Sequence, residues 1–179
     1  MSMWWIAGFA SIAALAFLVI SFNDLVVGRN RVRAAWSDID VQLQRRHDLV
    51  PQLVAIVKGY AAHERTTLEE VARLRNSAVA TEPVADRGRI ESRLQAEVTR
   101  LLALQESYPD LKASDNFAQL QRDLVDVEDR LQTARQQYNE TVRAFNTQIE
   151  NFPDLLLARP FGFRSLEFFQ AENREATPL

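Results

Sequence analysis

The sequence predicts an all-α protein in which one N-terminal transmembrane helix precedes an up-down antiparallel four-helix bundle with long coiled-coil-like helices. Three observations lead to this prediction. The first is an uncharged apolar run near the N-terminus, and the second is a long series of apolar residues at alternating spacings of three and four. The third is composition, because 5 Gly and 6 Pro in 179 residues are too few for the many turns of a β fold.

The apolar run covers residues 3–22 and contains no charged side chain. At about 1.5 Å per residue, a helix of this length crosses the roughly 30 Å hydrocarbon core of a bilayer. The alternative is a cleaved signal peptide, but the chain lacks a basic n-region and a convincing small-residue cleavage site. We therefore predict an uncleaved transmembrane helix after a short tail at residues 1–2. Its membrane-spanning side chains include Trp4, Trp5, Phe9, Leu15, Phe17 and Phe22.

Three arginines follow this run closely: Arg29, Arg31 and Arg33, opposed only by Asp24. The residues before the run carry no side-chain charge, so the positive-inside rule predicts an outside N-terminus and a cytoplasmic bundle. The same arginines are candidates for binding anionic lipid headgroups, at about 1 kcal/mol each, or they serve only to fix the topology. The net charge of -3 creates no field that favours a polyanion, so no nucleic-acid partner is expected.

The bundle is predicted over residues 23–152. Its first apolar face runs from Val32 to Ala78 and is interrupted at Arg46, Glu64 and Thr67. Pro51 lies within this face and either kinks the helix or ends it. The preserved spacing favours a kink, whereas the length of an unbroken helix favours a turn at residues 47–51, with the flanking segments packed antiparallel. We prefer the turn.

Residues 81–86 are expected to form a loop in which Asp86 caps the next helix. A third, shorter helix carries Ile90 and Leu94, and Ser114 can cap a fourth helix that Pro153 ends. The apolar residues of the fourth helix keep the three-four spacing throughout; they are Phe117, Leu120, Leu124, Val127, Leu131, Ala134, Tyr138, Val142, Phe145, Ile149 and Phe152.

A segment rich in aromatic residues follows at residues 153–171, and something must cover its apolar side chains. It either inserts at the lipid interface, contacts a partner, or folds back to close the open end of the bundle; folding back is the preferred interpretation. Residues 172–179 are polar and expected to be disordered.

No residue pattern indicates catalysis. His63 and Glu64 begin like the metalloprotease motif HExxH, but Thr67 stands where the second His should be, and the chain has no Cys. The glycines are scattered singly, which excludes the usual nucleotide-binding and acyl-transfer loops. The acidic residues Asp123, Asp126, Glu128 and Asp129 are read as a solvated helix face rather than a metal site. We predict no catalytic residue, no cofactor and no metal.

The segment from Asn23 onward resembles the LemA family of bacterial membrane-anchored helical proteins. The first matching block contains Ala35-Trp36-Ser37, Asp48-Leu49-Val50-Pro51 and Val57-Lys58-Gly59-Tyr60-Ala61, followed by His63-Glu64. The second contains Tyr138-Asn139, Phe145-Asn146, Phe152-Pro153 and Phe161-Gly162-Phe163, with Phe145 where the family commonly has Tyr. The resemblance covers nearly the whole chain and is loosest between residues 80 and 115.

The resemblance implies an N-terminal transmembrane helix, a four-helix bundle and a place in the bacterial inner membrane. It implies no established reaction; relatives are linked to membrane-organelle formation and to envelope quality control. The charges among the residues that match the family's signature are expected to form either an ion-pair network or a subunit contact. Candidate interface residues are Trp36, Asp40, Arg45, Arg46, Tyr60, His63, Phe161, Phe163, Phe168 and Phe169.

Two functions follow from these features. The first is a self-associating scaffold, a homo-oligomer in contact with membrane lipids that organises or remodels the membrane, because many anchors in one assembly give avidity. The second is an accessory or adaptor subunit for a membrane protease or an envelope signalling system. A hydrolase is a distant third, since it rests on His63, Glu64 and nearby carboxylates alone.

Overall fold

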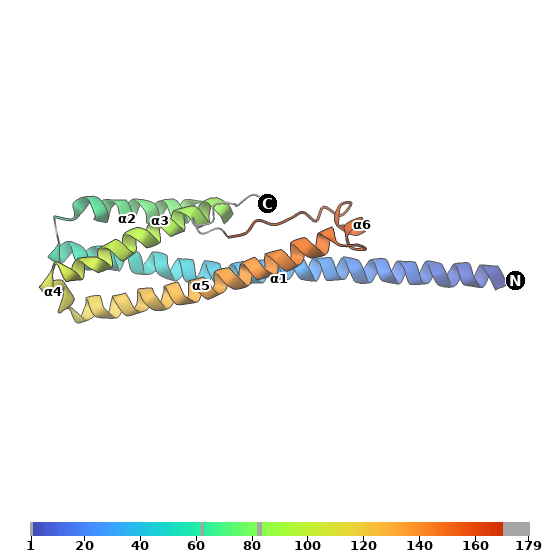
Figure 1. The fold of residues 1–179 in the computed structure, drawn as a ribbon, viewed down its shortest axis with the longest axis horizontal. Coiled ribbons are helices and arrows are strands. Elements are labelled where there is room, and N and C mark those ends of the chain that lie inside the picture. The colour runs from blue at the N-terminus through green and yellow to red at the C-terminus, as the bar shows by residue number, and fades with distance from the viewer. Residues whose placement is uncertain (1, 62, 82–83, 170–179) are drawn as a thin grey trace, which may run out of the picture. The chain divides into compact units, whose positions relative to one another are not determined.

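The structure is a computed structural model that describes residues 2–61, 63–81 and 84–169, and no strand occurs in these ranges. Figure 1 shows long helices joined by short connections, which confirms the predicted all-α class. The elements are α1 (Ser2–Tyr60), α2 (Arg65–Ala80), α3 (Val84–Ala103), the short 3-10 helix η1 (Leu104–Glu106), α4 (Pro109–Lys112), α5 (Asp115–Glu150) and α6 (Leu155–Ala158).

Helix α1 runs through Pro51 without a break, so the preferred turn at residues 47–51 is wrong. A proline at this position removes the hydrogen bond to the carbonyl of His47, four residues earlier. In the structure, Arg75 of α2 takes the place of the missing donor, with its Nε 3.2 Å from the His47 carbonyl oxygen. Because this carbonyl is satisfied from outside the helix, the helix can continue.

The turn instead follows Tyr60. The Glu64 amide donates to the Ala61 carbonyl at 3.1 Å, and α2 begins at Arg65. The chain therefore reverses after the apolar face of α1 is complete and not at its proline.

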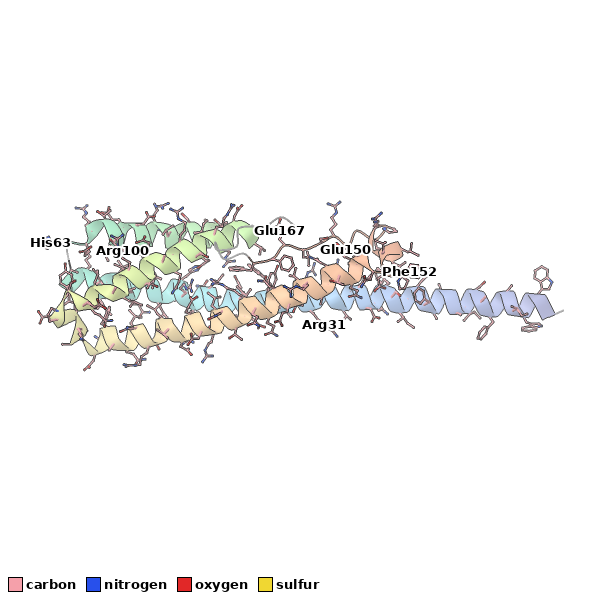
Figure 2. The ribbon with its side chains drawn as sticks, in the orientation of Figure 1. Arg31, His63, Arg100, Glu150, Phe152 and Glu167 are labelled. Carbon is pink, nitrogen blue, oxygen red and sulfur yellow. The ribbon has the colours of Figure 1, made fainter. Side chains whose placement is uncertain are left out.

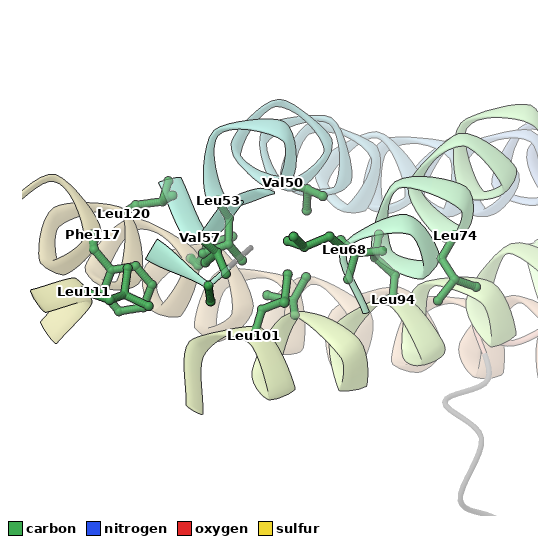
Figure 3. Close-up of a cluster of buried hydrophobic side chains, with 14 residues drawn as sticks. Val50, Leu53, Val57, Leu68, Leu74, Leu94, Leu101, Leu111, Phe117 and Leu120 are labelled. Carbon is green, nitrogen blue, oxygen red and sulfur yellow. The ribbon is translucent and has the colours of Figure 1, made fainter. Parts of the chain in front are cut away.

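The helices form two compact units. Unit 2 is formed by Asp38–Gln136 together with Phe168 and Phe169, and it contains the second half of α1, all of α2 and α3, and the first half of α5. Each of these four helices contributes three side chains to one buried apolar cluster, shown in Figure 3. They are Val50, Leu53 and Val57 of α1, Leu68, Val71 and Leu74 of α2, Leu94, Val98 and Leu101 of α3, and Phe117, Leu120 and Leu124 of α5.

Burial of one such side chain stabilises the folded state by about 1.5–3 kcal/mol, so this cluster is the main support of unit 2. Leu111 of α4 is fully buried in the same cluster and closes its end. The equal contribution of four helices matches the predicted bundle.

The two expected helix caps behave differently. Ser114 precedes α5, and its Oγ accepts a hydrogen bond from the Phe117 amide at 3.4 Å, as expected for a cap. Asp86 is not a cap, because α3 already begins at Val84. Asp86 lies in the first turn of α3, where a carboxylate interacts favourably with the helix dipole, and it pairs with Arg89.

Unit 1 is formed by the part of α1 up to Ser37 together with Gln137–Glu167. Trp36, near the end of the first segment, meets Tyr138 at the start of the second, and the earlier Phe22 meets Phe161 near the end of the second. The two segments are therefore antiparallel within this unit. The predicted disordered tail at residues 172–179 lies outside the described residues.

Candidate functional site

The first part of α1 exposes apolar side chains over its whole length. Among the predicted membrane-spanning residues, Trp4, Trp5, Phe9, Leu15 and Phe17 are all exposed, with Trp4 at 86%. By length and composition, α1 is the one helix of the described chain that could span a membrane, and almost none of this apolar stretch is buried in the protein. Exposed large apolar groups at this density need an apolar environment, which associates the protein with a membrane.

Phe22, the last residue of the apolar run, differs from the others because it packs against the protein itself. Its ring centroid lies 5.0 Å from that of Phe161 and 6.0 Å from that of Phe163, both in edge-to-face geometry. Phe163 in turn meets Phe145 of α5 at 6.4 Å. Such pairs contribute about 0.5–1.5 kcal/mol each beyond their buried area. The four rings therefore fix the aromatic segment beside the end of the apolar run.

Polar bonds from α5 hold the aromatic segment as well. The Asn146 side chain donates to the Leu166 carbonyl at 2.9 Å and accepts from the Leu166 amide at 2.8 Å. The Tyr138 hydroxyl donates to the Glu167 carbonyl at 2.9 Å, and burial raises the pKa of this hydroxyl, which keeps it a donor. Residues 163–167 thus fold back along α5. Tyr138 and Asn146, which both belong to the second block that resembles the family, hold this segment in place.

The three predicted headgroup arginines lie just beyond this aromatic cluster. Arg29 is half-buried, with its guanidinium carbon 5.2 Å from the centre of the Phe163 ring. Arg31, labelled in Figure 2, and Arg33 are exposed. Arg29 therefore supports the aromatic segment through a cation-π contact, while Arg31 and Arg33 remain available to anionic groups.

A separate, buried group of charges lies in unit 2. The fully buried Glu91 of α3 meets two neighbours from α1: its Oε1 is 2.7 Å from His47 Nε2, and its Oε2 is 3.4 Å from Arg46 Nη1. Arg46 is 1% exposed and also pairs with Glu128 of α5. Glu128 completes the group with Arg135, at 3.7 Å. We call these five residues the buried charge cluster.

Burial lowers the pKa of Arg46 to about 10, against the opposing attraction of Glu91. Burial also lowers the pKa of Arg135. The Arg46 guanidinium therefore stays charged at neutral pH. The cluster joins α1, α3 and α5 by buried ion pairs, and the Glu91 carboxylate is shared between Arg46 and His47.

The other residues considered for chemistry lie at the surface. Two arginines hold Asp126: Arg45 Nη1 and Arg130 Nε are each 3.0 Å from its carboxylate, and Arg130 is the larger cause of a lowered Asp126 pKa. His63 is exposed at the turn after α1, beside a shallow pocket of about 290 Å³ that also involves Arg100. Figure 2 labels both residues at the same end of unit 2. Within residues 2–61, 63–81 and 84–169, no three His, Cys, Asp or Glu side chains are grouped as metal ligands.

The candidate interface residues divide into buried and exposed ones. Trp36 packs edge-to-face on Tyr138 at 5.5 Å, and Arg46 belongs to the buried charge cluster. Asp40 pairs with Arg87 at 2.9 Å and Arg45 with Asp126. Two of the aromatic candidates, Phe163 and Phe169, are buried, the latter beneath Arg135 at 4.9 Å. The remaining candidates are exposed to solvent: Tyr60, His63, Phe161 and Phe168.

Comparison with known proteins identifies the family. The model of the LemA family matches residues 35–179, which is most of the chain. The protein belongs to the LemA family. The matched region begins after the apolar run and contains all of unit 2 and the whole aromatic segment.

Similar curated proteins carry two kinds of name. Magnetosome protein MamQ 2 of Paramagnetospirillum magneticum is 27% identical over 94% of this chain and 71% of its own length. Magnetosome protein MamQ of Magnetospirillum gryphiswaldense is 26% identical over the same shares. Protein LemA of Metamycoplasma hominis is 28% identical over 86% of this chain and 70% of its own length.

Sequence reasoning on this LemA-family chain missed Glu91 and Glu128 as the partners of Arg46. It also missed His47, which pairs with Glu91, and Arg135, which pairs with Glu128. One signal was present: Glu91 stands three residues before Leu94 and thus at a core spacing. Arg46 likewise stands between Leu43 and Val50 at spacings of three and four. A charge on an apolar helix face predicts a buried ion pair, because an unpaired buried charge is too costly.

Proposed function

We propose that this LemA-family protein is a non-enzymatic, membrane-anchored helical scaffold that self-associates and organises or remodels the bacterial inner membrane. The observation that carries the proposal is the continuity of α1. One helix supplies an exposed apolar run long enough to cross a bilayer and, further on, the core residues Val50, Leu53 and Val57 of the bundle. The similarity to proteins named magnetosome proteins agrees with the link to membrane organelles that the family resemblance implies.

The bundle's regular apolar face does not itself support self-association, because those side chains are already buried within unit 2. The exposed apolar run offers a contact instead. A side chain added at Gly8 would meet no other atom within 4 Å outside its own stretch of helix. The neighbouring small residues Ala7 and Ser11 are four residues apart and thus lie on the same face of the helix. Small residues at this spacing let two transmembrane helices approach closely, and one anchor per subunit adds avidity to any assembly.

The mass of the full chain in detergent, measured by light scattering over a dilution series, tests this proposal. We expect a discrete assembly whose mass is a whole multiple of the chain mass. Gly8→Leu should weaken it by blocking close approach of the anchors. Gly59→Leu is the matched control, because Gly59 also lies in α1 with open space around it but outside the apolar run. A monomer at every concentration would contradict self-association.

The orientation is part of the same proposal: the N-terminus lies outside and unit 2 in the cytoplasm, supported by Arg31 and Arg33 directly after the apolar run. Since the chain has no Cys, Val125→Cys introduces a single thiol at an exposed site of unit 2. A membrane-impermeant maleimide should label it only after the membrane is permeabilised. Labelling in intact spheroplasts would reverse the orientation.

An adaptor role is the second candidate, and the exposed Tyr60 and His63 favour it. Both belong to the family-like first block, yet neither is buried in the bundle core. A partner that binds this turn should co-purify with the full chain in fixed stoichiometry and be lost from the Tyr60→Ser and His63→Ser variants. Capture of further copies of the chain alone would remove the adaptor interpretation.

A further inference from the structure

One group of exposed apolar side chains in unit 1 is not explained by the anchor itself. Beyond the apolar run, the exposed large apolar residues of the described part of this unit are Val27, Phe152, Leu156 and Phe161. Three of these four belong to the short segment from Phe152 to Phe161, and they are 81%, 64% and 60% exposed in that order. We call this segment the aromatic turn. Such a concentration of exposed apolar groups indicates a contact surface.

The aromatic turn is held in one conformation by its own backbone. The Leu156 amide donates to the Pro153 carbonyl at 3.1 Å, and the Phe161 amide donates to the Leu157 carbonyl at 3.2 Å. Leu157 and Ala158 point inward and are buried. Leu156 and Phe161 are therefore presented outward by a folded turn and do not belong to a loose loop end.

The position of the turn relative to the apolar run is fixed by a ring contact. Phe161 lies 5.0 Å from Phe22, and Phe22 is the last residue of that run. A helix of 20 residues spans about 30 Å, which is also the thickness of the hydrocarbon core. The run thus has no length to spare, and Phe22 must lie at the hydrocarbon boundary. Figure 2 shows Phe152 beside α1, at the point from which the helix continues alone toward its N-terminus.

The charges around the turn suit a lipid surface. Between Asn151 and Ser165, the charged residues are Asp154, Arg159 and Arg164, and both arginines are exposed. Apolar groups flanked by basic residues are typical of segments that lie in the headgroup region, with the apolar face among the upper acyl chains. Outside this segment, the exposed Asp24 and Glu150 add acidic charge near Phe22 and Phe152, and the exposed Arg31 adds basic charge further along α1.

We propose that the aromatic turn inserts Phe152, Leu156 and Phe161 into the leaflet from which α1 emerges, as a second membrane contact beside the anchor. This inference rests on the membrane anchoring of the proposed function, but it does not require self-association. Its occupant is the acyl-headgroup boundary of a bilayer and not a second protein. The buried Phe163 and the Asn146 bonds to Leu166 hold the turn at this level.

The absence of Cys allows a direct test in the full chain. Single-thiol variants Phe152→Cys and Leu156→Cys carry a polarity-sensitive fluorophore, and each protein is reconstituted at low density in vesicles of phosphatidylethanolamine and phosphatidylglycerol. Val19→Cys, in the apolar run at 52% exposure, is the control for lipid contact. Val125→Cys, in unit 2 at 51% exposure, is the control for water contact. Quenchers attached to lipid chains and quenchers dissolved in water are then compared.

We expect both turn probes to emit at shorter wavelength than the Val125 probe and to be quenched by shallow lipid-attached quenchers about as strongly as the Val19 probe. Turn probes quenched like the Val125 probe, with the Val19 probe still in lipid, would overturn the insertion and leave the anchor intact. Turn probes shielded from both quenchers would place another protein on the turn and overturn it too. A Val19 probe in water would overturn the anchor, and with it both proposals. Two independent probe positions and unchanged helix content guard against a local distortion by one label.

Discussion

Removing the Glu91 carboxylate should strongly destabilise unit 2. Glu91→Leu takes away the ion pair to Arg46 and the hydrogen bond to His47, both buried. Breaking a buried pair by removing one partner costs about 3–5 kcal/mol, because the remaining charge stays desolvated. Arg46 keeps Glu128 as a second partner, so we expect about 3 kcal/mol, at the lower end.

The cost arises because the buried Arg46 guanidinium loses its Glu91 partner. A second substitution can test this explanation. The double variant Arg46→Leu with Glu91→Leu removes the Arg46 guanidinium as well, while Arg135 keeps Glu128 as its partner at 3.7 Å. Most of the loss should therefore be recovered, since apolar replacement of a buried pair is often neutral. Urea unfolding of the detergent-solubilised chain, followed by far-UV circular dichroism, measures both variants. Glu69→Leu is the matched control, because its pair with Arg65 is exposed and should have no measurable effect. A double variant as unstable as Glu91→Leu would refute the reasoning.

Three further predictions concern other parts of the chain. Asn146→Leu removes two hydrogen bonds to the Leu166 backbone, so unit 1 should lose about 1–3 kcal/mol of stability and trypsin should cut the aromatic segment faster. An unchanged cleavage rate would show that these bonds do not hold the segment in place. Gly59→Ala should raise the free energy of unfolding by up to about 1 kcal/mol, because alanine has the higher helix propensity. Gly28→Ala should raise it less, or lower it, because the added Cβ would lie 3.0 Å from the Phe145 ring. Equal effects of the two variants in thermal melts would argue against this close approach. Ion pairs with arginine lower the pKa of Asp126 in the folded state, so the stabilisation by these pairs is complete above the ordinary pKa of 3.8 and is lost as the pH falls further. Asp126→Asn should therefore make the stability of the protein less sensitive to acid. Identical profiles of stability against pH for the two proteins would disprove the pairing.

Local sequence pattern was enough for the long helix α5 but not for the end of α1. The three-four spacing from Phe117 to Ile149 and the Ser114 cap describe α5 (Asp115–Glu150) closely, because apolar periodicity and capping act over neighbouring turns. The apolar run was equally clear, since charge exclusion over residues 3–22 needs no tertiary information.

The missed features depend on residues that are far apart in the chain. Pro51 ends a helix unless something satisfies the His47 carbonyl, and the group that does so is Arg75 in the next helix. The partners of Arg46 come from α3 and α5, so its position on an apolar face showed that a partner must exist but not which one. The aromatic segment is held by Tyr138 and Asn146 through backbone carbonyls and an amide, and such bonds leave no pattern in the sequence of the segment itself.

Folding back of the aromatic segment covers only part of its apolar side chains. Phe163 is buried against Phe22 and Phe145, as folding back requires. Phe152 and Phe161 remain exposed, so folding back does not cover the whole segment. Folding back therefore accounts for Phe163, and the exposed Phe152 and Phe161 are residues for which we propose lipid contact.

Self-association within a bilayer is the central claim, and energy transfer between chains tests it most directly. Val125→Cys chains carrying a donor or an acceptor fluorophore are mixed in vesicles, and the lipid-to-protein ratio is then raised stepwise. We expect that energy transfer persists when the protein is diluted with lipid and falls only when unlabelled chain competes. Transfer that declines with dilution to the level of randomly placed monomers would contradict the scaffold.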